Sequence, residues 1–476
     1  MQGSSFRDPG GALRFVGGTP VRFVRSSHAE ELRGFLDSAT ARSWRARGAL
    51  VESTELQAPE LDAYRNDPGF TQALGAEPWG GIWRHERVFF PSSADEWSQG
   101  MLHRAGAITL DLALDLLKDG RGLKDATPAN VLFRGSQPVF VDLLSVERRD
   151  LKDPLWLPYA QFIRTFVLPL LVTKATGLPL RAVFTVGREG IEPEVARDLV
   201  PLSKRLSGPG LWHVTVATML SRARSTAANG APPKRSVPPE RAQYVLKHLF
   251  EGLRKSLDAV APSGDPQSSW TGYVKDHHSP AYFDAKRAFV AAAVEEMQPK
   301  TVLDIGCNTG ELSVIAATRG AQVVAIDNDP QVIERVFRSA SGDALNVLPL
   351  VVDIASPTPG RGWMNRELPS FLDRATGAFD QVLAMAVIHH LLVTNGIPLS
   401  GVIDLFARLT RNSVALEFVP PSDPLFRRLA RGRDYLYADL SRTSFEEACK
   451  RRFEIVRAEP LPSGERVAYV LRKTTT

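Results

Sequence analysis

Cysteine is almost absent from this chain of 476 residues, which contains only Cys307 and Cys449. Two cysteines cannot build a disulfide framework or a cysteine-ligated zinc site. Long apolar runs are missing too: the run of most interest, residues 166–172, is far short of the ~20 residues that a membrane span needs. The first residues, MQGSSFRDPGG, lack the basic start and apolar core of a signal peptide, so we expect a cytoplasmic protein without a transmembrane segment.

A strong charge of one sign is also lacking, because 58 Lys and Arg face 53 Asp and Glu, a net charge of +5. Arginine pairs such as Arg427-Arg428 are therefore interpreted as solvated faces, and nucleic acid is not an expected partner. The composition, 43% hydrophobic and 23% charged, is that of a soluble globular protein. The length predicts two to three domains, whereas nothing in the sequence indicates an oligomeric state.

Residues 301–330, TVLDIGCNTGELSVIAATRGAQVVAIDNDP, combine two apolar runs, a glycine turn and a helical pattern. The first run ends on Asp304 and the second on Asp327, and Gly306 and Gly310 lie in the turn. Glycine lets the backbone bend sharply and leaves room for a ligand where a Cβ would collide. The order of strand, turn, helix and strand predicts one βαβ unit of a parallel nucleotide-binding sheet, with Asp327 placed to accept both hydroxyls of a ribose.

The turn differs from a dinucleotide fingerprint, which needs a third glycine to seat a pyrophosphate. Asp304 stands just before Gly306, and an acid beside the ligand repels phosphate and suits a cation. The run DIGCNTG resembles the S-adenosylmethionine loop of class I methyltransferases, and the resemblance covers roughly residues 270–476. It implies an α/β fold with a Rossmann-like sheet of seven strands and S-adenosyl-L-methionine as cofactor. The alternative is an ordinary glycine turn of an α/β protein.

The later runs continue this pattern. Further strands are predicted over residues 347–352, 379–385, 414–418, 453–456 and 466–471. By the resemblance, Asp353 after the third strand binds the adenine amino group. The aromatic-rich segment before the first strand covers the cofactor and substrate mouth, with packing as the alternative role for Trp270, Tyr273, Tyr282 and Lys286. The cofactor-binding residues that the resemblance implies are Asp304, Gly306, Cys307, Asn308, Gly310, Asp327, Asn328, Asp353, Ile354 and Met385.

Candidate bases follow the fourth and fifth predicted strands. His389 and His390 come after the fourth strand and Glu417 lies at the end of the fifth, where the reacting groups of open α/β sheets gather. A histidine is the natural base for an oxygen or carbon acid. His390 is preferred, because a His-His-Leu pattern recurs in the small-molecule methyltransferases that the chain resembles, and an interior or capping role is the alternative. The missing Asn-Pro-Pro-aromatic motif counts against amide or adenine nitrogens, which favours O- or C-methylation of a small-molecule, glycan or lipid-linked acceptor.

The N-terminal half has a different pattern: a hairpin over residues 13–24, a strand over 82–90 and an amphipathic helix over 102–117. Asp125, Asn130 five residues later and Asp142 after a hairpin have the spacing of a kinase catalytic loop and metal-binding strand. The segment resembles the C-terminal lobe of aminoglycoside-phosphotransferase-type kinases.

That layout would make Asp125 the acceptor of the substrate proton and Asn130 and Asp142 the magnesium ligands of Mg-ATP. However, Lys124 stands where the kinase triplet has another residue, and neither a Gly-rich loop nor a strand lysine with a helix glutamate is found. The favoured interpretation is therefore a degenerate α+β kinase-like domain. A bifunctional kinase and methyltransferase is one alternative, and a non-catalytic scaffold that presents an acceptor or partner is another. Outside the kinase alternative no metal site is expected.

The predicted organisation is a kinase-like domain over residues 1–221, a proline-rich linker over 222–240 and a methyltransferase domain over 241–476. The methyltransferase domain begins with a helical lead-in over 240–260, whose apolar stripe is Val245, Leu249, Leu253 and Leu257. Taken whole, this order resembles a family of bacterial two-part methyltransferases, some of which are described by similarity to nodulation proteins.

Overall fold

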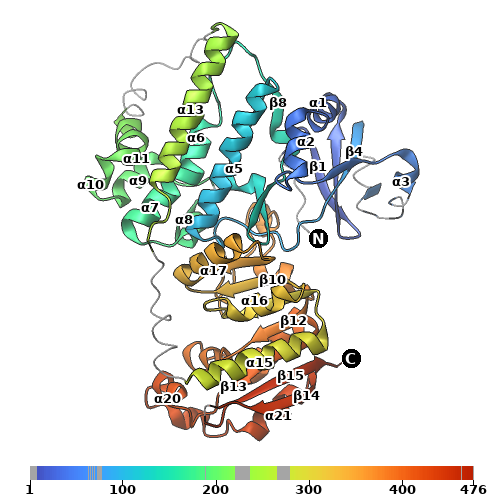
Figure 1. Ribbon diagram of the computed structural model, residues 1–476, viewed down its shortest axis with the longest axis vertical. Helices are drawn as coiled ribbons and strands as arrows, with labels where there is room; N and C mark the ends of the chain where they lie inside the picture. The colour runs from blue at the N-terminus through green and yellow to red at the C-terminus, as the bar shows by residue number, and fades with distance from the viewer. Residues whose placement is uncertain are drawn as a thin grey trace. The chain divides into compact units, whose positions relative to one another are not determined.

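The computed structural model divides into two compact units, Met1–Gly264 with Arg361–Leu368, and Asp265–Gly360 with Pro369–Thr476 (Figure 1). The structure describes residues 8–62, 64, 66, 68, 70–71, 78–187, 189–219, 236–264, 279–462 and 464–474. Most of the expected linker, together with Trp270 and Tyr273, lies outside these ranges. The division after Gly264 differs from the expected domain start at residue 241, and a short stretch of the C-terminal half belongs to the first unit.

The first unit contains an antiparallel sheet of four strands in the order β1-β2-β4-β3. The expected hairpin is confirmed, with Gly17 and Gly18 at φ of +56° and +81° in its turn. The expected strand over residues 82–90 is wrong in its bounds, because β4 ends at His85 and Phe90 has a φ of +52° that no extended strand adopts. The strands are β1 (Gly11–Val16), β2 (Thr19–Arg25), β3 (Ser53–Glu55) and β4 (Trp79–His85).

Two long helices, α5 (Gln99–Lys118) and α13 (Pro239–Ala259), pack side by side in this unit (Figure 1). The Arg254 guanidinium donates to the Ala107 carbonyl at 3.0 Å and pairs with Asp111 at 3.0 Å. Helix α13 was expected to introduce the second domain, but these contacts make it part of the first. Its expected stripe is half right, because Leu253 and Leu257 are buried while Val245 is exposed. The buried face is Ala242, Leu246, Phe250, Leu253 and Leu257.

Shorter elements complete the first unit. Pro169 restarts a helix, as its missing N–H requires, because the π-helix η3 (Ile163–Val167) gives way there to α7 (Leu168–Thr176). The remaining elements are α1 (Ser26–Leu36), α2 (Ala39–Ala46), α3 (Ala58–Asp62), β5 (Arg121–Leu123), η1 (Pro128–Asn130), β6 (Val131–Arg134), β7 (Gln137–Phe140), η2 (Leu143–Ser145), β8 (Val146–Arg148), α6 (Tyr159–Phe162), α8 (Leu180–Val186), α9 (Pro193–Leu199), α10 (Leu202–Arg205), α11 (Gly208–Gly210), η4 (Leu211–Val216) and η5 (Trp363–Asn365).

The second unit is built on a seven-stranded sheet in the order β11-β10-β9-β12-β13-β15-β14. Strands β9 to β13 are parallel and β15 runs antiparallel to both β13 and β14. The chain therefore reverses its direction of strand addition between β9 and β12, where open α/β sheets bind ligands. All seven expected strands are present: β9 (Thr301–Ile305), β10 (Gln322–Asp327), β11 (Val347–Val351), β12 (Phe379–Ala384), β13 (Thr410–Phe418), β14 (Phe453–Pro460) and β15 (Val467–Lys473).

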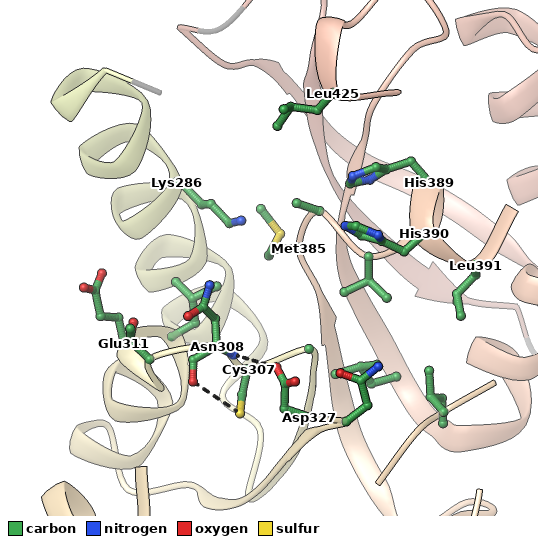
Figure 2. Close-up of a pocket in the computed structure, with 18 of the residues that line it drawn as sticks. Lys286, Cys307, Asn308, Glu311, Asp327, Met385, His389, His390, Leu391 and Leu425 are labelled. Carbon is green, nitrogen blue, oxygen red and sulfur yellow. Dashed lines mark hydrogen bonds between the residues drawn. The ribbon is translucent and has the colours of Figure 1, made fainter. Parts of the chain in front are cut away.

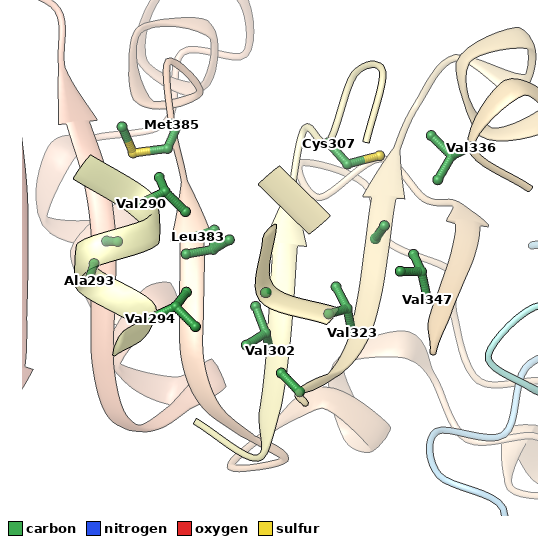
Figure 3. Close-up of a cluster of buried hydrophobic side chains, with 14 of the residues drawn as sticks. Val290, Ala293, Val294, Val302, Cys307, Val323, Val336, Val347, Leu383 and Met385 are labelled. Carbon is green, nitrogen blue, oxygen red and sulfur yellow. The ribbon is translucent and has the colours of Figure 1, made fainter. Parts of the chain in front are cut away.

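The core of this unit lies between the sheet and its helices (Figure 3). Val290 and Val294 of α15 pack over Leu383 of β12, and Val302 of β9 lies in the same cluster. Every residue of β9 and β11 is buried, as expected for parallel strands covered on both faces. The helices are α15 (Pro280–Met297), α16 (Glu311–Thr318), α17 (Pro330–Gly342), α18 (Phe371–Ala375), η6 (His390–Thr394), α19 (Leu399–Leu409), α20 (Pro424–Ala430), η7 (Asp434–Tyr437) and α21 (Arg442–Lys450).

Candidate functional site

The turn between β9 and α16 requires both of its glycines. Gly306 has a φ of +67°, and a Cβ there would lie 2.8 Å from Cγ2 of Val387. Gly310 has a φ of +81° and lies against Val336, where a Cβ would approach to 3.1 Å. The N–H groups of Gly306 and Cys307 donate to the Ile326 carbonyl at 2.8 and 3.0 Å. These bonds hold the turn beside the end of β10.

Asp327 ends β10 beside this turn (Figure 2). Its carboxylate accepts the backbone N–H of Asn308 at 3.2 Å and that of Asp329 at 3.0 Å. Burial raises the pKa of Asp327 above its usual range, while the backbone donors act in the opposite direction. The two N–H groups therefore fix the orientation of a carboxylate that also faces a cavity.

That cavity has a volume of about 920 Å³ and lies at the carboxyl ends of β9 to β12. Such a volume suits a cofactor and part of an acceptor. Met385 and Lys286 approach each other across it (Figure 2). The residues expected to bind the cofactor that line the cavity are Gly306, Cys307, Asn308, Asp327, Asn328, Asp353, Ile354 and Met385.

Asp304 and Gly310 do not line the cavity. The Asp304 side chain is buried and accepts a hydrogen bond from the Ser313 hydroxyl of α16 at 2.6 Å. Burial raises the pKa of Asp304 to about 6. The expectation that this acid faces a cationic ligand is therefore replaced by a structural role, because its hydroxyl partner ties β9 to the start of α16.

The two adjacent histidines both reach the cavity wall (Figure 2). Their ring centroids are 4.3 Å apart. His389 is buried and His390 is partly buried at the start of η6. Burial, and then the positive charge of Arg466, lower the pKa of His390 below its usual value. A neutral imidazole at neutral pH can accept a proton.

Glu417, the third expected base, is fully buried and does not line the cavity. It accepts hydrogen bonds from the Tyr282 hydroxyl at 2.7 Å and Arg466 Nη1 at 3.1 Å, and Lys286 Nζ lies 3.3 Å away. Burial acts to raise the pKa of Glu417, but Lys286, Arg466 and the hydrogen bonds outweigh it, so the pKa is lowered. A carboxylate held by two cations is a poor base. The structure assigns Glu417 the role of anchor for cavity-lining residues.

All three residues that contact Glu417 line the cavity: Tyr282, Lys286 and Arg466. Tyr282 and Lys286 were expected near the mouth because of their place before the first strand. Arg466 was missed. Its guanidinium is buried between Glu417 and Asp423. Two of its nitrogens, Nε and Nη2, donate to the Asp423 carboxylate at 2.8 and 3.0 Å. No sequence signal marks it, because its acidic partners lie more than forty residues away and only the sheet joins them.

The cavity suits an adenosyl cofactor on its chemistry. The oriented Asp327 carboxylate matches ribose hydroxyls, the partly buried Asp353 lies two residues after the third strand, and Ile354 and Leu312 offer apolar surface. Among the residues that the structure describes, no three His, Cys, Asp or Glu side chains gather as metal ligands would.

The kinase-like triad of the first unit is brought together in part. The Asn130 side chain donates to the Asp125 carbonyl at 3.2 Å, and burial raises the pKa of Asp142 while Arg22 acts to lower it. The Arg22 Nη1 atom lies 3.4 Å from both Asp142 and Asp8. The Arg22 guanidinium therefore pairs with Asp142, the acid that would bind magnesium in a kinase.

The sheet order, the glycine turn and the size of the cavity fit an S-adenosylmethionine-dependent methyltransferase, and the comparison with known proteins supports this class of enzyme. Residues 276–443 match the model of a methyltransferase domain. The nodulation protein NoeA of Rhizobium meliloti (strain 1021) is similar along nearly the whole chain, with 28% identity over 479 residues that cover 99% of this chain and 95% of that protein.

Two solved structures are similar at lower identity. The N-methyltransferase NodS from Bradyrhizobium japonicum WM9, in complex with S-adenosyl-L-homocysteine, is 12% identical with a TM-score of 0.32 and covers 44% of this chain and 95% of its own. The bifunctional kinase-methyltransferase WbdD is 18% identical with a TM-score of 0.29 and covers 40% of this chain and 39% of its own. At these scores neither likeness bears on the acceptor or on phosphotransfer.

Proposed function

We propose that the enzyme moves the methyl group of S-adenosylmethionine to an oxygen or carbon acid of a small-molecule, glycan or lipid-linked acceptor, with His390 as the base. The observation that carries this proposal is a cavity-lining histidine whose pKa is lowered, at the start of η6, which follows β12. Because it is neutral at neutral pH, His390 can take the acceptor proton when the methyl group is transferred.

Besides the base, the site must align the acceptor with the cofactor. Methyl transfer is an in-line displacement, so the protein must hold the acceptor atom opposite the sulfonium. Lys286 and Arg466 are fixed by Glu417 at 3.3 and 3.1 Å, so they can orient an acceptor without being free to swing. Asp327 would hold the ribose and Asp353 the adenine. When bound, the cofactor supplies the electrophilic methyl group.

The cofactor part is tested by isothermal titration with S-adenosylmethionine. Asp327→Ala removes an oriented carboxylate, and the loss of even one hydrogen bond from a hydroxyl to a charged group costs about 1.5–3 kcal/mol, so affinity should fall by at least roughly 10-fold to 150-fold. Asp329→Ala is the matched control, because Asp329 caps α17 by accepting the Gln331 N–H at 2.8 Å and does not line the cavity. Equal affinities of wild type and Asp327→Ala would remove this assignment.

The acceptor part is tested by incubating the enzyme with methyl-labelled cofactor and cell extract, followed by untargeted detection of labelled product. The proposal expects label in a hydroxyl-bearing or carbon-acid product, lost with His390→Gln. Label on an amine nitrogen would contradict the proposed acceptor atom while leaving the cofactor assignment intact.

We also propose that the first unit is a scaffold and does not transfer phosphate. The support is Arg22, which pairs with Asp142 where a magnesium ion would be needed. The Mg-ATP alternative has no comparable support.

A further inference from the structure

A group of exposed apolar side chains lies on the helices of the first unit between residues 193 and 219. They come from α9, from α10 with the residue after it, and from the π-helix η4 with the helical residues 217–219 that follow it. Each is between 42% and 65% exposed. We call this group the apolar surface, and its members are Val195, Leu199, Leu202, Leu206, Trp212 and Met219.

The apolar surface rests on a firmly packed base. A Cβ on Gly210 would lie 2.1 Å from the Lys204 carbonyl oxygen, and the Thr215 hydroxyl donates to the Arg205 carbonyl at 2.8 Å. His213, next to Trp212, is hydrogen-bonded to the Ser256 hydroxyl of α13 at 3.0 Å. These contacts fix the helices to one another and to α13. The exposure is therefore a property of the folded unit.

Helical spacing places the apolar side chains in pairs. Val195 and Leu199 are four residues apart on α9, and Leu202 and Leu206 are four residues apart across α10. Residues at this spacing project from the same side of a helix. Each short helix thus presents two apolar side chains together, and α9 also buries Ala196. Isolated surface leucines need no explanation, but such a grouping marks an interaction site.

The sequence around these helices is rich in basic residues. Residues 193–235 of the sequence contain seven Lys or Arg and two Asp or Glu, a net charge of +5 that equals the net charge of the whole chain. The rest of the chain is therefore balanced. Three of the seven basic residues lie in the described part of this segment: Arg197, the exposed Lys204, and Arg205 beside Leu206. The exposed apolar side chains and the surplus positive charge therefore belong to the same segment of the sequence, residues 193–235.

Leucine and tryptophan beside lysine and arginine suit the interface of an anionic bilayer. The apolar side chains enter the headgroup boundary, tryptophan is favoured at that depth, and basic residues are attracted by the negative surface potential. No helix within the described ranges has the length and apolar character to cross a bilayer, so the contact would be peripheral. An unbalanced local charge favours a partner with many negative charges over the small patch of a single protein.

We propose that residues 195–219 form a peripheral membrane-binding surface for anionic lipid. This inference does not rest on the proposed methyl transfer, because the binding involves only the first unit and needs neither cofactor nor acceptor. Its failure would leave the proposed function standing. If both hold, the surface brings the enzyme to the place where a lipid-linked acceptor is found.

The test is co-sedimentation of the full-length protein with vesicles of phosphatidylcholine, with or without phosphatidylglycerol. The proposal expects binding to the mixed vesicles, little binding to phosphatidylcholine alone, and release by added salt. The double variant Leu202→Asp/Trp212→Asp should reduce the partition coefficient at least tenfold. Trp363→Asp is the matched control, since Trp363 is 64% exposed elsewhere in the first unit, and it should bind as wild type does.

Three results would overturn the proposal. One is a folded wild type that ignores anionic vesicles, and another is equal loss of binding in the Trp363→Asp control. The third is a dimer, seen by light scattering without lipid, that the double variant dissociates, because the apolar surface would then join two copies of the chain. Thermal melts of each variant show whether the fold is intact.

Discussion

The two buried acids of the second unit, Asp304 and Glu417, have opposite protonation tendencies for a simple reason. Burial acts to raise the pKa of both. Asp304 accepts hydrogen bonds from the neutral Ser313, and these bonds together with the positive charge of Lys286 offset burial only in part, so its pKa is about 6. Glu417 has two cationic partners as well as a tyrosine hydroxyl, and its pKa is lowered. The charge of the neighbours decides which acid carries its proton.

Asp304 therefore makes the cofactor-free protein less stable as the pH rises through its folded pKa of about 6. The folded state keeps this proton at a pH where the unfolded state, with a pKa near 3.9, has lost it. Asp304→Asn should remove that penalty, so the variant should gain roughly 2–3 kcal/mol relative to wild type between about pH 4 and pH 7. Urea unfolding of both proteins across this range measures the difference, and a constant difference would contradict the predicted pKa.

His390→Gln should lower kcat by about 10²–10⁴-fold, the usual contribution of a positioned base, with little change in cofactor affinity. Because the pKa of His390 is lowered, wild-type kcat should hold below the ordinary histidine pKa of ~6.5 and fall only at more acidic pH. His389→Gln is the matched comparison and should cost less than about tenfold. The opposite order of the two variants would transfer the role to His389.

At the scale of elements, the turn after β9 leaves little room for a side chain at Gly306. Gly306→Ala meets both an unfavourable φ of +67° and a contact of 2.8 Å with Val387. We expect a loss of about 1–3 kcal/mol in stability and weaker cofactor binding. Adding Val387→Ala should relieve the steric contact but not the unfavourable φ. The double variant should therefore recover only part of the lost stability and cofactor affinity. Urea unfolding and titration calorimetry measure both effects, and full recovery would show that φ is not limiting.

The strands and the turn of the second unit could be predicted because their signals are local. Apolar runs that end on an acid, as at Asp327, need no distant contact to be recognised. The face of α13 could not be predicted as well, because its partner α5 is more than a hundred residues away. The role of Glu417 was missed for the same reason, because Arg466 reaches it only once the sheet has formed. Asp304 is a different case: its partner Ser313 is only nine residues away, but the pattern of apolar residues does not show that this acid bonds to a hydroxyl instead of facing a ligand.

At the scale of the whole molecule, we expect methyl transfer in the second unit and no phosphate transfer in the first. Wild type should show no Mg²⁺-dependent thermal shift with ATP, because Arg22 already pairs with Asp142. Asp142→Asn should leave the methyl-transfer rate within about twofold of wild type. A Mg²⁺-dependent shift that Asp142→Asn abolishes would contradict the scaffold proposal and support the bifunctional alternative.

The first unit contains one segment from the C-terminal half. Arg361 pairs with the buried Asp95 carboxylate and donates to the Ser93 hydroxyl at 3.1 Å, and residues 361–368 belong to that unit. Deleting the residues before 222 to test the scaffold proposal would therefore also remove the partners of Arg361. Point variants such as Asp142→Asn are the cleaner experiment.

The same segment also sets an order of events during synthesis of the chain. Asp95 leaves the ribosome long before Arg361, and β9, β10 and β11 are made in the interval. At translation speeds of about 5–20 residues per second, the stretch from Gly264 to Arg361 takes roughly 5–20 s. The N-terminal unit therefore cannot complete its structure before three strands of its successor have emerged. A transcript cut short after residue 264 would therefore encode a product in which Asp95 lacks its arginine partner.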